Sequence, residues 1–153
     1  MKRFLVIGVI LLVLGIALLV FLQQFYVGKK MANVTIGGRS FSLEVADTAI
    51  ERSRGLQGRA ELADGNGMLF IFSEPVSADF WMKDTLIPLD LIWIADGKVA
   101  GITPDVQPQP GVGDAELELY KSPGLVTQVI ELSAGSVMDL GIKVGDQVLV
   151  ELQ

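Results

Sequence analysis

An aromatic and a charged side chain lie close together within residues 79–90 of this 153-residue sequence. If this segment begins as a β-strand with Phe80 and Met82 directed into the core, side-chain alternation places Trp81 and Lys83 together on the opposite face. An exposed indole can stack on a sugar ring, and neighbouring charges can fix the orientation of a ligand. We therefore predict a ligand-binding surface at Trp81 and Lys83. The alternative is that Trp81 is buried beneath a loop or packs against a helix.

A carboxylate at the end of the same segment is the next candidate. Asp90 lies in an otherwise apolar stretch, and a buried carboxylate needs a charged partner, hydrogen bonds or a raised pKa. The basic residues that could pair with it are Lys83, Arg54 and Arg59. Asp90 is then either a structural group, which pairs with a cation or holds the backbone of the adjacent turn, or an acid–base or substrate-binding group. Thr85, in that turn, completes the predicted ligand-binding set.

Three arginines crowd one short predicted helix. Arg52 and Arg59 are seven residues apart and share a helix face, and Arg54 lies between them. Such a cluster could bind a carboxylate or a phosphate through paired hydrogen bonds. The alternative is that it anchors the helix to acidic strands of the same domain.

The composition excludes several kinds of active site. The chain has no histidine and no cysteine, which rules out a Ser-His-Asp triad, a cysteine nucleophile and a histidine metal ligand. No spacing typical of a calcium-binding EF-hand occurs, and we predict no catalytic residue, no metal and no cofactor. From Met31 onward, eight basic residues face eighteen acidic ones, a net charge of −10. This charge argues against a nucleic acid partner, because phosphate binding needs a basic surface.

Short apolar stretches between glycine-rich turns predict a mostly β domain of the α+β class. Gly37 and Gly38 predict a hairpin, and Thr48 with Glu51 forms a capping box for a helix over 49–57. We expect strands at 34–36, 39–45, 68–72, 78–83, 89–95, 98–102, 116–121, 126–132 and 147–152, one helical turn at 136–140 and a long loop at 103–113. Together these elements predict a compact, barrel-like sheet, mixed or antiparallel, with one or two short helices.

The N-terminal sequence predicts a membrane anchor. Residues 4–22 contain no charged or strongly polar side chain, and as a helix these nineteen residues would be about 28 Å long, close to the thickness of the hydrocarbon core. No convincing cleavage site follows, which favours an uncleaved anchor over a cleaved signal peptide, and the flanking charges favour an N-terminus inside the cell. We predict a cytoplasmic N-terminus (1–3), a transmembrane helix in the lipid bilayer (4–25), a stalk (26–32) and an extracytoplasmic domain (33–153) of a single-pass cell-membrane protein.

Five stretches of the sequence match the pattern of one protein family, in the family's order over residues 45–150. They are Glu51-Arg52-x-Arg54-Gly55-Leu56-x-x-Arg59, Gly67-Met68-Leu69-Phe70-x-Phe72, Phe80-Trp81-Met82-Lys83-x-Thr85-x-Ile87-Pro88-Leu89-Asp90, Glu131-x-x-Ala134-Gly135 and Gly145-Asp146. On these residues the chain resembles the domain of unknown function 192 family. The resemblance implies a compact, mainly β fold and supplies no established reaction. Gln57 stands where the family usually has methionine, and Asp84 where it usually has asparagine.

Three functions remain open at this point. The favoured hypothesis is a membrane-anchored extracytoplasmic binding module for a small polar molecule or an envelope polymer such as a glycan. The second is a non-catalytic envelope interaction or assembly protein, which docks through an exposed apolar or acidic patch. The third is a carboxylate-based hydrolase that uses Asp90 with Asp79 or Asp84. The oligomeric state is left open.

Overall fold

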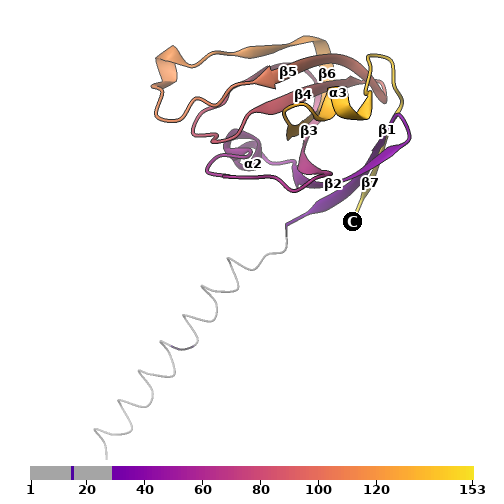
Figure 1. Cartoon of the computed structure of the whole chain (residues 1–153), viewed down its shortest axis with the longest axis horizontal. Coiled ribbons are helices and arrows are strands. Elements are labelled where there is room, and N and C mark those ends of the chain that lie inside the picture. The colour runs from indigo at the N-terminus through magenta and orange to yellow at the C-terminus, as the bar shows by residue number, and fades with distance from the viewer. Residues whose placement is uncertain (1–14, 16–28) are drawn as a thin grey trace, which may run out of the picture.

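The computed structural model describes residues 29–153 and the single residue Gly15 (Figure 1). The predicted cytoplasmic N-terminus (1–3), the transmembrane helix (4–25, apart from Gly15) and the first part of the stalk (26–28) lie outside the described residues. Within the described part of the chain, no helix is both long enough and apolar enough to span a membrane. The first strand begins at Met31, inside the range predicted as the stalk.

The domain is mostly β, as predicted, with seven strands and two short α-helices among residues 29–153. The elements in chain order are β1 (Met31–Ile36), β2 (Arg39–Ala46), α2 (Ala49–Arg54), β3 (Asn66–Phe80), β4 (Leu89–Ala95), β5 (Lys98–Val106), the 3₁₀ turn η1 (Asp114–Glu116), β6 (Tyr120–Ser133), α3 (Ser136–Leu140) and β7 (Val148–Leu152). They form one sheet in the order β5-β4-β6-β3-β2-β1-β7. Its pairs are antiparallel except β2 with β3, so the sheet is mixed.

The predicted barrel-like closure is wrong, because the curved sheet is not closed (Figure 1). Its two edge strands, β5 and β7, meet at one isolated bridge between Lys98 and Gln147. The adjacent Val148 N–H donates to the carbonyl of Gly97 at 2.9 Å. From Val148 onward the last strand pairs with β1 instead, so no continuous ladder joins the two edges.

β3 is one strand where the sequence predicts two. Its ladder with β6 is interrupted between Ile71 and Val76 and then resumes, with Pro75 inside the interruption. Proline has no N–H to donate, and within sheets it is tolerated at such irregularities. The strand ends at Phe80, so Trp81 and the residues after it are not placed by strand alternation.

Two predicted elements differ from the observed ones: a strand that is largely replaced by loop structure, and a helix that is shorter than predicted. The predicted strand 116–121 begins in η1 and joins β6 only at Tyr120. The predicted helix 49–57 ends earlier, because Gly55 adopts a positive φ of 49° and closes the helix after Arg54. By contrast, β4 has the predicted bounds.

The core has two parts, one on each face of the sheet. One cluster contains apolar residues of β1, β2 and β7 together with Val137 of α3. The other lies on the face that α2 covers and includes Leu56, Phe70 and Trp93. The Trp93 indole is buried, and its N–H donates to Thr103 Oγ1 at 2.9 Å. This second face carries the candidate site.

Candidate functional site

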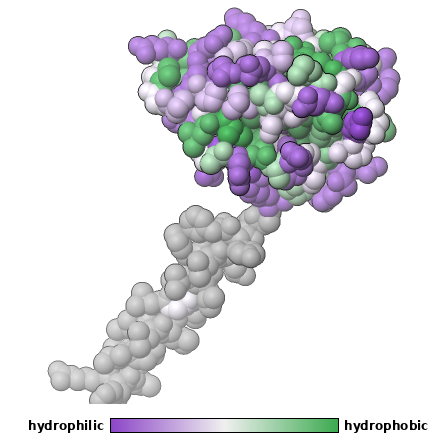
Figure 2. Space-filling view, viewed as in Figure 1, coloured by the Kyte–Doolittle hydropathy of each residue, from purple (hydrophilic) through white to green (hydrophobic). Residues whose placement is uncertain are grey.

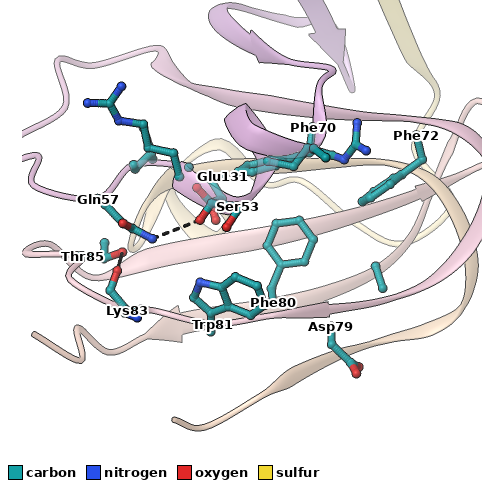
Figure 3. A pocket seen from close by; sticks show the side chains of 16 residues that line it. Ser53, Gln57, Phe70, Phe72, Asp79, Phe80, Trp81, Lys83, Thr85 and Glu131 are labelled. Carbon is teal, nitrogen blue, oxygen red and sulfur yellow. Dashed lines mark hydrogen bonds between the residues drawn. The ribbon is translucent and has the colours of Figure 1, made fainter. Parts of the chain in front are cut away.

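A cavity of about 250 Å³ opens between α2 and the C-terminal end of β3 (Figure 3). We call it the α2 cavity. Much of its wall is apolar, from Leu56, Phe70, Phe72, Ala78 and Phe80, whereas Ser53, Gln57, Thr85 and Glu131 supply uncharged or buried polar groups. The Trp81 indole and four charged side chains complete the lining. The charged residues are Arg52, Arg54, Asp79 and Lys83. An apolar pocket with a few polar groups is the usual form of a small-molecule site.

A wider, more open hollow of about 780 Å³ adjoins this cavity. We call it the outer groove. The two share Ala49, Ser53, Arg54, Gln57, Trp81 and Lys83, so these residues mark the mouth of the α2 cavity. The groove is also lined by Ile50 of α2 and by residues around η1, including Asp114, Leu117 and Leu119.

Helix α2 is held in place by its own end groups and by one arginine. Thr48 and Glu51 form the predicted capping box, which satisfies backbone N–H groups of the first turn. Arg52 donates to the backbone carbonyls of Asp47 at 2.6 Å and Ile71 at 3.0 Å. Its guanidinium also lies 5.2 Å from the centroid of the Phe72 ring. Arg52 therefore attaches α2 to β3 and thereby fixes one wall of the cavity.

The buried carboxyl of Glu131 is the polar group that the sequence analysis did not single out. Glu131 lies in β6, an interior strand of the sheet, opposite Met68 of β3 and Leu91 of β4. It is 4 % exposed, and its Oε2 atom has no hydrogen-bond partner among the described residues. Burial raises its pKa to about 8, so the carboxyl is largely protonated at neutral pH.

A sequence signal for Glu131 existed. It lies in the apolar stretch 126–132, on the same strand face as Val129. The argument that singled out Asp90, a carboxylate on an apolar strand, applies equally to this residue. Gly55 borders this carboxyl, because a Cβ added there would be in van der Waals contact with Glu131 Oε2 at 3.9 Å and with Phe70 at 3.4 Å.

Trp81 and Lys83 both lie at the mouth of the cavity. Trp81 is 38 % exposed, and Figure 3 shows its ring beside that of Phe80, facing Glu131 and Ser53. The Lys83 ammonium forms an ion pair with Asp114 of η1. The hydrogen bond to that carboxylate raises the pKa of Lys83, so the lysine remains cationic. The indole is therefore not sealed in the core.

A tight turn places Thr85 next to this mouth. Asp84 adopts the left-handed conformation, with φ 51°, which aspartate and asparagine tolerate better than most residues. The Thr85 N–H donates to the carbonyl of Met82 at 3.1 Å, and Thr85 is only 4 % exposed. The positive φ accounts for a short polar residue at position 84 in both the family pattern and this chain.

Arg59 and Asp90 do not join the other predicted site residues. Arg59 donates to both oxygens of Glu44. Burial raises the pKa of Glu44, but the hydrogen bonds from Arg59 and Lys29 outweigh it, and the pKa is lowered overall. Asp90 is 1 % exposed and lines a different hollow.

Both Asp90 oxygens accept backbone N–H groups, from Asp105 of β5 and from Val137 of α3, each at 2.9 Å. Asp90 is thus a clamp between three elements, with none of the three predicted cations as its partner. Arg54, Trp81, Lys83 and Thr85 are the predicted residues that share the α2 cavity. Among residues 29–153 no cluster of three or more acidic side chains is arranged to hold a metal ion.

Comparison with known proteins places the domain in a family. The model of the DUF192 family, described as uncharacterized ACR, matches residues 32–150. The chain belongs to the DUF192 family. The resemblance predicted from the sequence motifs is therefore confirmed, and the DUF192 match includes every residue that lines the α2 cavity.

Two solved structures resemble this DUF192 domain. One, a protein of unknown function from Novosphingobium aromaticivorans DSM 12444, is 34 % identical, with a TM-score of 0.73 over 81 % of this chain and 88 % of that one. The other, from Sinorhizobium meliloti 1021, carries the description "putative transcription regulator". It is 31 % identical, with a TM-score of 0.70 over 80 % of this chain and 94 % of that one. None of the curated proteins matches the chain.

Proposed function

We propose that this protein is a membrane-anchored binding module that takes a small organic molecule into the α2 cavity. The observation that carries the proposal is the buried Glu131 carboxyl, whose Oε2 atom has no hydrogen-bond partner among residues 29–153 and which lines an open cavity. A buried polar group without a partner destabilises a folded protein by about 1–3 kcal/mol. A ligand that makes this hydrogen bond would recover that energy on binding.

The shape of the cavity favours a compact ligand over a polymer. Its volume of about 250 Å³ lies just below the range of about 300–1,000 Å³ that is usual for drug-sized molecules. Aromatic rings line it, and the rings of Phe70 and Phe80 pack edge to face with their centroids 4.8 Å apart. A flat or apolar body of a few atoms fits such walls. An envelope polymer such as a glycan would have to lie in the outer groove and reach the cavity with one group.

Binding is measured by the fluorescence of Trp81, the exposed tryptophan, while the full chain in nanodiscs is titrated with a panel of small organic acids, amides, amines and sugars. We expect at least one class to bind. Glu131→Leu should weaken that binding about tenfold or more, because a hydrogen bond to a buried group is lost. Glu151→Leu, at an exposed strand position, is the matched control. Absence of binding across the panel, or equal binding by both variants, would overturn the proposal.

We also propose that the domain lies on the extracytoplasmic side, anchored through residues 4–25. The absence of cysteine from the chain permits a direct test with single-cysteine variants. Asp64→Cys, in an exposed turn, should react with a membrane-impermeant maleimide in intact cells, and Lys2→Cys should react only after permeabilisation. The reverse pattern would contradict this topology.

One observation favours an alternative role in protein interaction. Ile50 is 82 % and Leu119 47 % exposed, and both line the outer groove. In Figure 2 an apolar patch lies on the visible face in the region that α2 occupies in Figure 1. Under this alternative, Ile50→Asp would abolish the capture of crosslinked envelope proteins and leave small-molecule binding unchanged. Capture that survives the substitution would remove the groove as the interaction surface.

The geometry gives less support to hydrolysis or nucleic acid binding. Asp79 and Asp90 line different hollows, and the Asp79 carboxylate points away from the α2 cavity in Figure 3. The pair of carboxyl groups that flanks one cleft in glycoside hydrolases is therefore not formed by these residues. The net charge of −10 from Met31 onward opposes contact with nucleic acid, and so it gives no support to a regulator function of the kind named for the Sinorhizobium relative.

A further inference from the structure

We infer that the ligand of the α2 cavity is a small organic anion, a carboxylate with an apolar body, whose charge lies at Arg54 and whose far end presents an oxygen acceptor to Glu131. This inference rests on the proposed function and names the chemical class of the ligand. Three observations carry it: the charges around the mouth, the state of the buried carboxyl and the lining between them.

The lining of the cavity is basic on an acidic domain. Three cations, Arg52, Arg54 and Lys83, line the cavity, against the exposed carboxylate of Asp79. Asp114, which lines the adjoining outer groove, pairs with Lys83, so the local charge remains positive. The domain as a whole has a net charge of −10 from Met31 onward. A local positive site on a negative surface attracts anions and discriminates against cations.

Arg54 is the cation that is available to a ligand. Arg52 is engaged with two backbone carbonyls, and Lys83 is paired with Asp114. Arg54 is exposed and takes part in none of the ion pairs or side-chain hydrogen bonds among residues 29–153. Its guanidinium can form two parallel hydrogen bonds with a carboxylate.

Glu131 offers a donor rather than a negative charge. No lysine or arginine among the described residues pairs with it, and its burial favours the protonated form. A protonated carboxyl donates its O–H to a carbonyl, ether or hydroxyl oxygen. An ammonium ligand would meet an uncharged carboxyl instead of a counter-charge and would have to pass the cations Arg54 and Lys83 at the mouth.

The apolar part of the lining restricts the body of the ligand. Phe70, Phe80 and Leu56 line the same cavity as the buried carboxyl and offer no polar side-chain atom. A phenyl ring or a short aliphatic chain packs against such a surface. The predicted ligand is thus an apolar spacer with an anion at one end and an oxygen acceptor at the other.

Three probes of similar size test this class: 4-acetylbenzoate, which has both end groups, 4-acetylbenzylamine, which exchanges the anion for a cation, and 4-isopropylbenzoate, which lacks the acceptor. Each is titrated into the full chain in nanodiscs of phosphatidylcholine, a lipid without net charge, and binding is followed by saturation-transfer NMR and Trp81 fluorescence. We expect 4-acetylbenzoate to bind about tenfold or more tightly than either comparison probe, because each loses one charge-assisted or buried hydrogen bond.

The variants separate a contact at Arg54 from a general effect of charge. Arg54→Gln should weaken the binding of 4-acetylbenzoate about tenfold. Arg39→Gln removes the same charge from an exposed position on β2 outside the cavity and should have little effect. Glu131→Gln keeps a neutral donor and should retain binding, whereas Glu131→Leu should lose it.

The outcomes also separate this inference from the proposed function. If 4-acetylbenzylamine binds more tightly than 4-acetylbenzoate and this binding is lost in Glu131→Gln, the assignment of an anion is overturned. The cavity would then still be a ligand site. Equal losses in Arg54→Gln and Arg39→Gln would overturn the contact at Arg54. If none of the three probes binds, the inference fails, and the broader panel of acids, amides, amines and sugars then decides whether the proposed function fails with it.

Discussion

Glu131→Gln will remove most of the decrease in the free energy of unfolding that the parent domain shows between pH 5 and pH 9. In the folded domain, burial raises the pKa of Glu131 from 4.5 to about 8, whereas in the unfolded chain this carboxyl titrates near its ordinary value. Between these values the folded state holds a proton that the unfolded state has released. The free energy of unfolding therefore falls as the pH rises, and the loss is complete above about pH 8. The difference corresponds to about 5 kcal/mol.

This pH window isolates Glu131 from the other shifted groups. The chain has no histidine or cysteine, so the side chains that usually titrate near neutrality are absent. The pKa values of Glu44, Asp47 and Glu51 are lowered, so their contributions are lost on the acid side, as the pH falls below their ordinary values. The pKa values of Lys30, Lys83 and Tyr120 are raised from ordinary values of 10.0 or more. These groups therefore affect the free energy of unfolding only in strong alkali.

Urea unfolding of the full chain in a non-ionic detergent at pH 5, 7 and 9 measures the effect. The charged groups that line the cavity with Glu131 are Arg52 and Arg54 from α2, Asp79 from β3 and Lys83 after it. Glu151→Gln, the same substitution on the exposed edge of β7, should retain the parent's pH dependence. A Glu131→Gln protein whose stability still falls with the parent's slope would show that the buried carboxyl does not hold the extra proton.

Asp90→Ala is expected to destabilise the domain by about 3–5 kcal/mol, because it leaves two backbone donors without an acceptor. The N–H groups of Asp105 and Val137 each donate to one Asp90 oxygen at 2.9 Å, and Asp90 is 1 % exposed, so little water can replace it. The loss would loosen β5 and α3 together. The midpoint of urea unfolding and the hydrogen exchange of these two amides measure it.

The conservative variant Asp90→Asn tests the cause of this loss. Asparagine keeps one acceptor oxygen in place, so its destabilisation should be about half that of alanine. Asp139→Ala, at an exposed position of α3, should change stability by less than about 0.5 kcal/mol. A loss below about 1 kcal/mol in Asp90→Ala would mean that the clamp contributes little and would reopen a ligand-binding role for this carboxylate.

Local signals predicted the parts of the fold that depend on neighbouring residues. The hairpin at Gly37 and Gly38, the capping box at Thr48 and the bounds of β4 are all observed. Errors arose where pairing between distant segments decides the structure. Pro75 suggests a break in β3, yet the ladder with β6 continues on both sides of it. The failure of the two sheet edges to pair depends on where β7 turns to β1, which no local pattern encodes.

The candidate site was partly predictable for the same reason. Trp81, Lys83 and Thr85 are close in sequence and share the mouth of the α2 cavity with Arg54. Strand alternation, however, does not place Trp81 there, because β3 ends at Phe80. The Glu131 carboxyl comes from β6, far along the chain, and its role depends on which strands flank it.

The place of β1 in the sheet has a consequence for when the domain can fold. This first strand lies between β2 and β7, and the N–H of Gln153, directly after β7, donates to the carbonyl of Met31 at 3.0 Å. One of the two hydrogen-bonding edges of β1 therefore has no partner until β7 has been synthesised and has left the ribosome. Such pairing between the two ends of a domain slows folding and delays it until both ends are available. Until then, an unpaired apolar strand must be kept from aggregating.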